Sequence, residues 1–273
     1  MIFLKKLFNF YINSSIHVAL AVCALFCVTQ KYFELPFDKP LFFVLFYGTI
    51  TGYNFIKYAG IAKLHHRSLT ENLKVIQIFS LICFVLLLFY LSQLSRNVLL
   101  FFIPLGMLTL FYAVPFTKGF TKSLRNVPIL KIWVIAIVWS ASTVILPLVS
   151  LEKGIDCYVV LMLLQRLFFV VVLTLPFDIR DLQFDKRELQ TIPQLLGVER
   201  TKKVGFLLLL LTVLIEFFVT PNSSFKLVFL LVFMVMLVFL QRAKIKQTKY
   251  YASFWVEAIP IFWWVLLFLI AGR

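Results

Sequence analysis

The acidic residues of this chain are scarce, and several of them share one short segment. Four of the twelve Asp and Glu residues fall between Asp178 and Glu188. Asp178, Asp181 and Asp185 are spaced i, i+3 and i+7, so on a helix they would lie within about 60° of one another. Carboxylates this close repel one another unless a cation lies among them, and Mg²⁺ commonly binds one or two carboxylates together with phosphate oxygens. The spacing therefore leaves two interpretations open, a Mg²⁺–phosphate site and a solvated loop of mixed charge.

Basic side chains accompany the aspartates. Arg180 stands between the first two, and Lys186 and Arg187 follow the third. Guanidinium and ammonium groups are good partners for phosphate oxygens, so they would complement a metal-bound phosphate. A second basic segment contains Lys118, Lys122, Arg125 and Lys131. We expect it mainly to bind anionic lipid headgroups, with one or two of its residues close enough to reach a phosphate.

The chain that must position these residues is far more apolar than a soluble protein. It has 273 residues, of which 62% are hydrophobic and 14% charged. Soluble domains are about half apolar and about a quarter charged, and disordered chains are richer in charge still. The net charge is +15, but the chain has no polar, soluble body of the kind on which nucleic-acid-binding proteins carry their basic patch. The composition predicts an all-α membrane protein, with membrane lipids and no nucleic acid as partners.

Nine apolar segments approach the length of a bilayer crossing, which takes about 20 helical residues. Their apolar runs are continuous rather than alternating, which favours helices over strands. The predicted spans are Ile12–Thr29, Leu41–Gly60, Val75–Leu91, Val98–Pro115, Ile129–Val149, Cys157–Pro176, Val204–Val219, Phe225–Leu240 and Phe254–Ala271. Because a polytopic bundle folds as one unit, residues 1–273 are expected to form a single domain.

Positive charge alternates from loop to loop. Most Lys and Arg residues outside the spans lie in the N-terminal segment and in loops 61–74, 116–128, 177–203 and 241–253. By the positive-inside rule these segments are cytoplasmic, and nine crossings then put the C-terminus outside. The longest polar loops share the cytoplasmic side. We therefore expect the chemistry at the cytoplasmic face of a membrane, with the bacterial inner membrane as the expected location.

The carboxylate segment resembles a motif of a known family. Asp178-x-x-Asp181-x-x-x-Asp185, with Arg180 inside it and Thr191-Ile-Pro-Gln-Leu-Leu-Gly197 after it, is similar to the second aspartate-rich motif of UbiA-type intramembrane prenyltransferases. In that family the motif follows the sixth of nine helices, as it does in the predicted order here.

Two further stretches carry the same resemblance. Phe111-Tyr112-Ala-Val-Pro115, followed by Leu124-Arg125-Asn-Val-Pro128-Ile-Leu-Lys131, is similar to the tyrosine-proline and basic stretch that follows helix four in that family. The specific residues of the resemblance cover only about 112–131 and 176–197, although the helix count extends it over most of the chain.

The resemblance implies a nine-helix UbiA-like bundle and a reaction. Members bind a prenyl diphosphate through Mg²⁺ held by two aspartate-rich motifs, diphosphate departs, and the allylic cation alkylates a lipophilic acceptor such as an aromatic ring or quinone precursor. Metal and basic groups would stabilise the charge on the leaving group. Carried onto this sequence, the metal ligands are Asp178, Asp181 and Asp185; the diphosphate-binding residues are Asn54, Lys57, Lys118, Arg125 and Arg180; and Tyr112 contacts the acceptor or the prenyl chain.

The first aspartate-rich motif of the family departs from its pattern here. Asn54 fits the leading position, but Tyr58 and Ala62 occupy the two aspartate positions, and Lys57 adds a positive charge. Lys57 could bind diphosphate directly in place of a metal. The alternative function is a degenerate family member that binds isoprenoid lipid or assists membrane assembly without catalysis. A transporter is disfavoured, because few charged residues fall within the spans.

Several polar residues within the spans have more than one interpretation. Arg166 lies in the middle of the sixth span, where a charge is costly and marks a functional residue by default. It could instead pair with Glu216 in the next span, a structural role. Asn54 could face diphosphate or hydrogen-bond a neighbouring helix, and Tyr112 could meet substrate or anchor the membrane interface.

Overall fold

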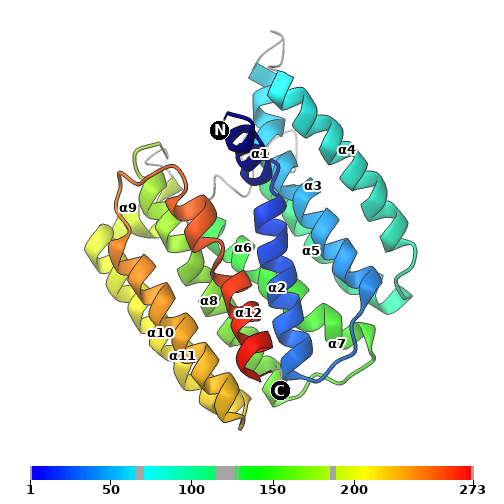
Figure 1. Cartoon of the computed structure of the whole chain (residues 1–273), viewed down its shortest axis with the longest axis vertical. Helices are drawn as coiled ribbons and strands as arrows, with labels where there is room; N and C mark the ends of the chain where they lie inside the picture. The colour runs from blue at the N-terminus through cyan, green and yellow to red at the C-terminus, as the bar shows by residue number, and fades with distance from the viewer. Residues whose placement is uncertain (1, 65–70, 115–126, 128, 185–188, 272–273) are drawn as a thin grey trace.

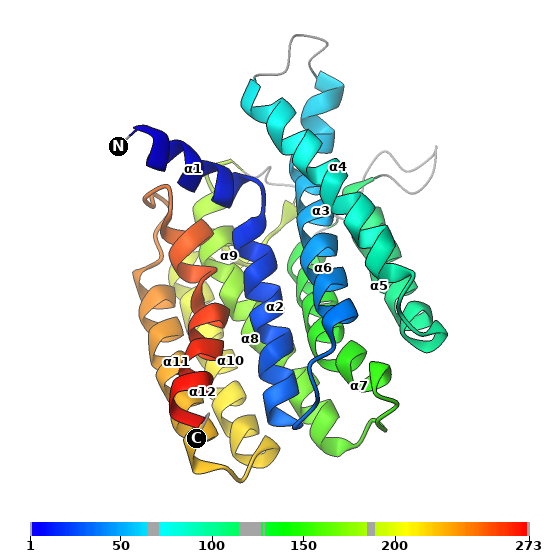
Figure 2. The ribbon, with the colours of Figure 1, turned by 45° about the vertical axis from the view of Figure 1, so that its right-hand side comes forward.

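The computed structural model describes residues 2–64, 71–114, 127, 129–184 and 189–271, and its regular elements in these ranges are all helical. The helices are α1 (Ile2–Asn13), α2 (Ile16–Tyr32), α3 (Lys39–Leu64), α4 (Glu71–Leu91), α5 (Arg96–Ala113), α6 (Leu130–Ser140), η2 (Ala141–Ile145), α7 (Leu146–Ser150), α8 (Cys157–Asp181), α9 (Ile192–Leu196), α10 (Val198–Val219), α11 (Ser223–Arg242), η4 (Tyr251–Val256) and α12 (Ile259–Ala271). The two segments named η are π-helical. The N- and C-termini lie toward opposite ends of the bundle (Figures 1 and 2).

Much of this bundle has the length and hydropathy of membrane-spanning helix. Within the described ranges, six helical stretches are long and apolar enough to cross a bilayer, and α1 with α2 would make a seventh if the bent pair is one span. Helices α3 and α10 occupy the two other predicted spans, 41–60 and 204–219. The chain is an integral membrane protein, and its number of crossings stays a prediction.

The beginning of the first predicted span, at Ile12, is wrong. Helix α1 ends at Asn13, Ser15 adopts a left-handed backbone with φ of 63°, and α2 starts at Ile16. The two helices meet at an angle of 58°. Short polar side chains at 13–15 favour such a break because they hydrogen-bond outside the helical ladder. Helix α1 therefore lies across one end of the bundle (Figure 2).

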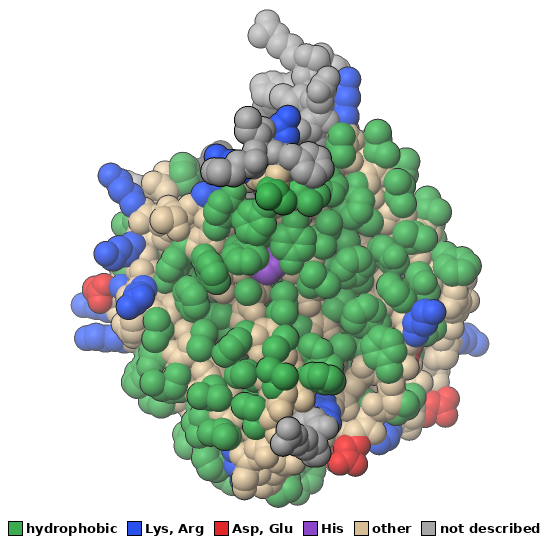
Figure 3. Space-filling view, in the orientation of Figure 1, with side chains coloured by type: hydrophobic (Ala, Val, Ile, Leu, Met, Phe, Trp, Pro, Cys, Tyr) green, Lys and Arg blue, Asp and Glu red, His purple; other side chains and the backbone are tan. Residues whose placement is uncertain are grey.

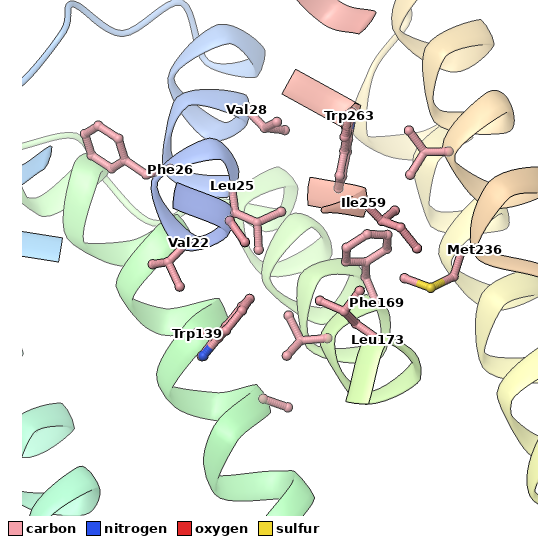
Figure 4. Close-up of a cluster of buried hydrophobic side chains, with 14 of the residues drawn as sticks. Val22, Leu25, Phe26, Val28, Trp139, Phe169, Leu173, Met236, Ile259 and Trp263 are labelled. Atoms are coloured by element: carbon pink, nitrogen blue, oxygen red, sulfur yellow. The ribbon is translucent and has the colours of Figure 1, made fainter. Parts of the chain in front are cut away.

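The apolar core lies between α2, α8, α11 and α12. Trp263 is fully buried, and its ring centroid lies 5.2 Å from that of Phe169 and 5.0 Å from that of Phe229. Figure 4 shows Leu25 of α2 and Met236 of α11 directed into the same cluster. Helices α4 and α5 are peripheral, since 17% and 11% of their apolar windows are buried. The face in Figure 3 is apolar over its centre, with charged side chains toward its edges, as expected for a surface in lipid.

A polar network crosses this core where the sequence places Arg166. Arg166 is fully buried; its Nη1 donates to the carbonyl of Leu25 at 2.7 Å, and its guanidinium lies 5.1 Å from the ring centroid of Trp263. Glu216 is instead bonded by Gln165 Nε2 at 2.6 Å and by Tyr32 Oη at 2.7 Å. The expected Arg166–Glu216 pair is therefore not a direct contact. The two charges interact electrostatically within one network, in which each is hydrogen-bonded by neutral partners, although Arg166 Nε has no hydrogen-bond partner among the described residues.

Close packing between α8, α10 and α11 depends on a glycine. A Cβ built on Gly205 would lie 2.8 Å from side-chain atoms of both Leu175 and Leu240. We expect Gly205→Val to lower the unfolding free energy by about 1–3 kcal/mol, because extra methyl groups in a packed interface force neighbours off their rotamers. Thermal unfolding in detergent measures this. Gly106→Val is the control, since a Cβ at Gly106 meets no atom within 4 Å; equal unfolding temperatures for the two variants would contradict the prediction.

Candidate functional site

The aspartates lie on the last turn of α8. The sequence predicts a polar loop from residue 177, but the helix continues to Asp181. It continues because Asp178 and Ile179 are still buried, and the side chain of Gln247 donates to the carbonyl of Pro176 at 2.9 Å, which supports the final turn. One helical face therefore holds two of the three predicted metal ligands. Asp185, the third, lies outside the described residues.

Two basic side chains hold these carboxylates. Lys131 Nζ of α6 lies 2.9 Å from Asp178 Oδ1 and 4.0 Å from Asp181 Oδ2. Arg180 Nε lies 2.8 Å from Asp181 Oδ1, and its guanidinium carbon lies 5.3 Å from the ring centroid of Phe177. The Asp178 side chain is only 6% exposed, so its pairing with Lys131 is shielded from solvent. Lys131 thus lies between both carboxylates, a position that its sequence context, a lipid-binding basic segment, does not predict.

A series of hydrogen bonds joins residues of α3 to the break between α1 and α2. Lys57 Nζ donates to Ser15 Oγ at 2.8 Å, and Ser15 Oγ donates to Asn54 Oδ1 at 2.8 Å. Asn54 Nδ2 donates to the carbonyl of Ser14 at 3.0 Å and to Ser80 Oγ at 2.8 Å. Asn54 is buried, and its hydrogen bonds join α3 to α4 and to the break between α1 and α2. This agrees with the interpretation of the sequence in which Asn54 hydrogen-bonds a neighbouring helix. Its contact with diphosphate stays a prediction.

The residue at the first aspartate position of the resemblance has a structural contact. Tyr58 Oη donates to the carbonyl of Asn13 at 3.0 Å, which fixes the end of α1 against α3. The side chain at the second position, Ala62, has no oxygen with which to bind a metal. Helix α3 therefore has a tyrosine and an alanine where the resemblance expects two carboxylates, with Lys57 next to the first of them.

Glu257 lies between η4 and α12. Its carboxylate interacts electrostatically with Lys57 of α3 and Arg180 of α8. Glu257 falls within the ninth predicted span, 254–271, and nothing in its own segment indicates these distant partners. We call the six residues Lys57, Lys131, Asp178, Arg180, Asp181 and Glu257 the polar cap. They comprise three cations and three carboxylates.

Two apolar cavities lie beneath the polar cap. The larger, of about 250 Å³, lies between α2, α3, α4, α5, α6 and η2. Phe84 and Leu110 line it and are also 43% and 55% exposed, so the cavity opens sideways toward lipid. The smaller, of about 90 Å³, lies between α3, α5 and α6 and includes Tyr112. Tyr53 and Trp139 line both cavities, together with Thr109 and Val138, and Trp139 Nε1 donates to Tyr53 Oη at 3.0 Å, so this aromatic pair forms part of the wall between them.

The cavities lead toward the polar cap. Lys57 follows Tyr53 by four residues on α3, and Lys131 precedes Ile135 of the smaller cavity by four residues on α6. Residues four apart share a helix face, so each lysine lies one turn beyond the cavity wall, toward the same end of the bundle. Ordered along α3, residues 44–53 line the larger cavity, 53 and 56 the smaller, and 57 belongs to the cap. An elongated apolar ligand with an anionic end fits this arrangement, with its apolar part in the cavities and its anionic end toward the cap.

The predicted site residues are brought together in part. Asp178, Asp181, Arg180 and Lys57 belong to the polar cap, and Tyr112 is 5% exposed at the smaller cavity. Asn54 is adjacent through Ser15. The other predicted residues, Lys118, Arg125 and Asp185, lie outside the described ranges.

The described part of the cap does not match the ligand set of a divalent metal. No group of three or more His, Cys, Asp or Glu residues in the described ranges could hold a metal ion. Asp178 and Asp181 are already paired with cations, and Mg²⁺ requires near-octahedral oxygen ligands at about 2.1 Å. An ammonium group between the two carboxylates would repel the ion. The residues described do not fit Mg²⁺.

The arrangement of the helices has known counterparts. No protein-family model matches this sequence, and no curated protein matches it by sequence comparison. Among solved structures, a UbiA homologue from Archaeoglobus fulgidus bound to DMAPP and Mg²⁺ superposes with a TM-score of 0.65 at 13% identity, covering 97% of this chain and 99% of that one. The same homologue bound to Cd²⁺ has a TM-score of 0.62 at 12% identity, covering 96% and 100%. A digeranylgeranylglyceryl phosphate synthase has a TM-score of 0.57 at 16% identity, covering 98% of both chains.

The apolar helices and these comparisons identify the protein as a polytopic helical membrane protein. Its fold is the UbiA-type prenyltransferase fold, as the resemblance of the carboxylate segment implied.

Proposed function

We propose that this protein binds an isoprenyl diphosphate and transfers its isoprenyl group to a lipophilic acceptor, an aromatic ring or quinone precursor. The observation that carries the proposal is the pair of apolar cavities, the larger open toward lipid, that lead toward a cap of three basic and three acidic side chains. The solved UbiA homologue with the same fold is bound to DMAPP or to GPP, which supports an isoprenyl diphosphate as the ligand class.

The proposed orientation follows from the two surfaces. The isoprenyl chain lies along the cavities, where apolar walls replace lipid, and the diphosphate lies at the cap beside Lys57 and Arg180. The sequence-predicted Lys118 and Arg125 would add positive charge there. Asn54 would orient Lys57 through Ser15.

The reaction breaks the bond between C1 of the isoprenyl chain and the diphosphate oxygen. The electron pair of this bond leaves with diphosphate. C1 then bonds to the acceptor, which loses a proton. Basic side chains stabilise the leaving group, and the faces of Tyr53 and Trp139 near the cap stabilise the allylic cation. No step is assigned to Mg²⁺, because the described residues do not supply its ligands.

The proposed topology places the cap at the cytoplasmic face. The positive-inside charge bias supports nine crossings with the N-terminus inside, in one domain of residues 1–273 and in a bacterial inner membrane. The opposite positions of the two termini agree with an odd number of crossings.

Labelled GPP tests the function. Membranes containing the protein are incubated with it, and both diphosphate release and label in the lipid fraction are measured. We expect release, and a loss of about 100-fold in Asp181→Ala, because Arg180 loses the carboxylate that positions it and small displacements of such groups are costly. Glu199→Ala is the control, since Glu199 is 81% exposed and pairs with Lys202. Equal release with and without the protein would contradict the proposal.

A second function, isoprenoid binding without transfer, is favoured by one observation. Both described aspartates of the cap are ion-paired within the protein. The same experiment separates the two functions, because GPP that is bound by the wild-type protein and recovered intact supports binding alone.

A further inference from the structure

Helix α1, which lies across one end of the bundle, has an apolar face and a polar face. With about 100° between successive residues, four apolar side chains fall within one arc of about 100°: Leu4, Leu7, Phe8 and Tyr11. The opposite arc holds three polar side chains: Lys5, Lys6 and Asn9. A helix with one apolar face and lysines on the other is typical of helices that lie in the plane of a membrane interface.

The bundle covers only part of the apolar face of α1. The ring centroid of Phe8 lies 5.0 Å from that of Tyr250 and 5.1 Å from that of Phe254. Leu4 and Leu7, which precede Phe8 on the same face, are 68% and 55% exposed. Figure 2 shows the N-terminal end of α1 projecting outward at the edge of the bundle. The apolar face therefore continues past the edge of the protein, where a membrane protein is surrounded by lipid.

The C-terminal half of α1 is fixed to the bundle by hydrogen bonds. Asn9 Oδ1 accepts from Lys249 Nζ at 2.8 Å and from Tyr250 Oη at 2.6 Å. The carbonyl of Asn13 accepts from Tyr58 Oη at 3.0 Å. Lysine and tyrosine side chains of this kind are frequent where a helical bundle meets the membrane surface. Because α1 is already held in place, little conformational freedom is lost when its projecting half contacts lipid.

The projecting half of α1 is positively charged. Lys5 and Lys6 are exposed, and among the described residues no acidic side chain is paired with them. The first acidic residue of the chain is Glu34, and the adjoining segment 243–250 adds three exposed lysines and no acid. A partner must therefore offer negative charge next to hydrocarbon. An anionic phospholipid has both, whereas an acidic protein segment has only the charge.

We propose that α1 is an interfacial helix that binds anionic phospholipid. Leu4 and Leu7 insert at the boundary between headgroups and acyl chains, and Lys5 and Lys6 contact the headgroups. This inference goes beyond the proposed function and does not depend on it, because it concerns a surface outside the polar cap and the cavities.

The test measures which lipid lies next to α1 in the whole protein. A fluorophore is attached to Leu4→Cys, with Cys157→Ser removing the exposed cysteine, since the other three cysteines are buried. The protein is placed in phosphatidylcholine nanodiscs that contain a small fraction of nitroxide-labelled phosphatidylglycerol or nitroxide-labelled phosphatidylcholine. We expect local enrichment of the anionic lipid, measured by quenching, to exceed that of the zwitterionic lipid about fivefold, the effect of one lysine near an anionic surface, or more. The preference should fall at about 0.5 M salt.

Two double variants show whether the lysines of α1 cause the preference. Lys5→Gln with Lys6→Gln, in the labelled protein, should reduce the preference to about twofold or less. Lys39→Gln with Lys153→Gln is the matched control, because it removes the same charge from exposed positions at the opposite end of the bundle and should keep the preference. Both double variants should keep the thermal unfolding midpoint of the labelled parent, since the four lysines are exposed.

The comparison of the two lipids decides the question in the labelled parent protein, even if a lysine variant fails to fold. Equal quenching by the two lipids overturns the binding of anionic lipid. Quenching by neither lipid places Leu4 away from the bilayer, as a protein partner or a second copy covering α1 would, and also overturns the proposal. A label at Leu7→Cys should give the same preference as the label at position 4, which excludes an effect of losing Leu4 itself.

Discussion

Arg166→Met is expected to lower the unfolding free energy by about 3–5 kcal/mol, the cost of leaving the other member of a buried charge network uncompensated. The wild-type guanidinium donates to the carbonyl of Leu25 and to Thr29 and Thr143, joining α8 to α2 and η2. Methionine fills similar volume but donates nothing, so Glu216 remains buried without its opposite charge. The loss is measured as the fall in the thermal unfolding midpoint in detergent.

A double-mutant cycle identifies the cause. If Arg166 and Glu216 stabilise each other through the network, Arg166→Met with Glu216→Gln should cost less than the sum of the two single changes, by about 1 kcal/mol or more. Arg242→Met is the control, because Arg242 is exposed at the end of α11. Strict additivity would mean that the two charges are not coupled, and an Arg166→Met unfolding midpoint equal to that of Arg242→Met would mean that the network does not stabilise the fold.

The fold could be predicted from sequence because the membrane makes hydrophobic length a strong signal. Each predicted span overlaps helix in the described residues, and Asp178 and Asp181 lie at the end of a helix as their motif implied. The sequence does not predict the break at Ser15, because the short polar run at 13–15 is flanked by apolar segments on both sides. The 58° bend between α1 and α2 is then fixed by tertiary bonds, Tyr58 to Asn13 and Lys57 to Ser15.

The site was predictable only where a local pattern carried it. The spacing of Asp178, Arg180 and Asp181 identified one wall of the cap. Their partner Lys131 lies 47 positions before Asp178 in the chain, and Glu257 lies far beyond it, so no short-range pattern connects them. Such pairs are set by which helix faces meet, and α6 with α8 is one of the larger helix contacts of the bundle. Isolated lysines and glutamates in apolar proteins should therefore be considered as possible partners of a motif elsewhere.

The balance of charges in the cap also explains how the altered α3 motif is compatible with a folded site. Tyr58, at a position where the resemblance expects an acid, leaves no second carboxylate wall on α3, and Lys131 neutralises the acids that remain on α8. Without that lysine, the buried Asp178 would lose the ammonium group that lies 2.9 Å from its Oδ1, which is unfavourable for an anion at the end of an apolar helix. The absence of acids at these positions of α3 and the pairing of Asp178 and Asp181 of α8 with basic side chains thus belong to one electrostatic arrangement.

Trp139→Ala is expected to shift the preference for isoprenyl diphosphates toward chains longer than GPP by about tenfold or more, because each additional buried CH₂ contributes about 0.8 kcal/mol. The Trp139 and Tyr53 side chains form part of the wall between the cavity of about 90 Å³ near the cap and the cavity of about 250 Å³ beyond it. Removing the indole joins the two into one passage. The ratio of dissociation constants for long- and short-chain diphosphates, measured in one nanodisc preparation, reports the shift.

Two matched variants show whether volume or hydrogen bonding sets the preference. Tyr53→Phe removes the acceptor of the 3.0 Å bond from Trp139 Nε1 but leaves both rings in place, and Trp139→Phe keeps an aromatic ring of smaller size. If the passage width decides chain length, Tyr53→Phe should behave as the wild type and Trp139→Phe should lie between the wild type and Trp139→Ala. An unchanged ratio in a folded Trp139→Ala protein would mean that the chain does not pass between these rings, and would place the isoprenyl group outside the two cavities. Because Trp139 lies in α6, two turns from Lys131, such a result would also separate the apolar passage from the cap that is proposed to hold the diphosphate.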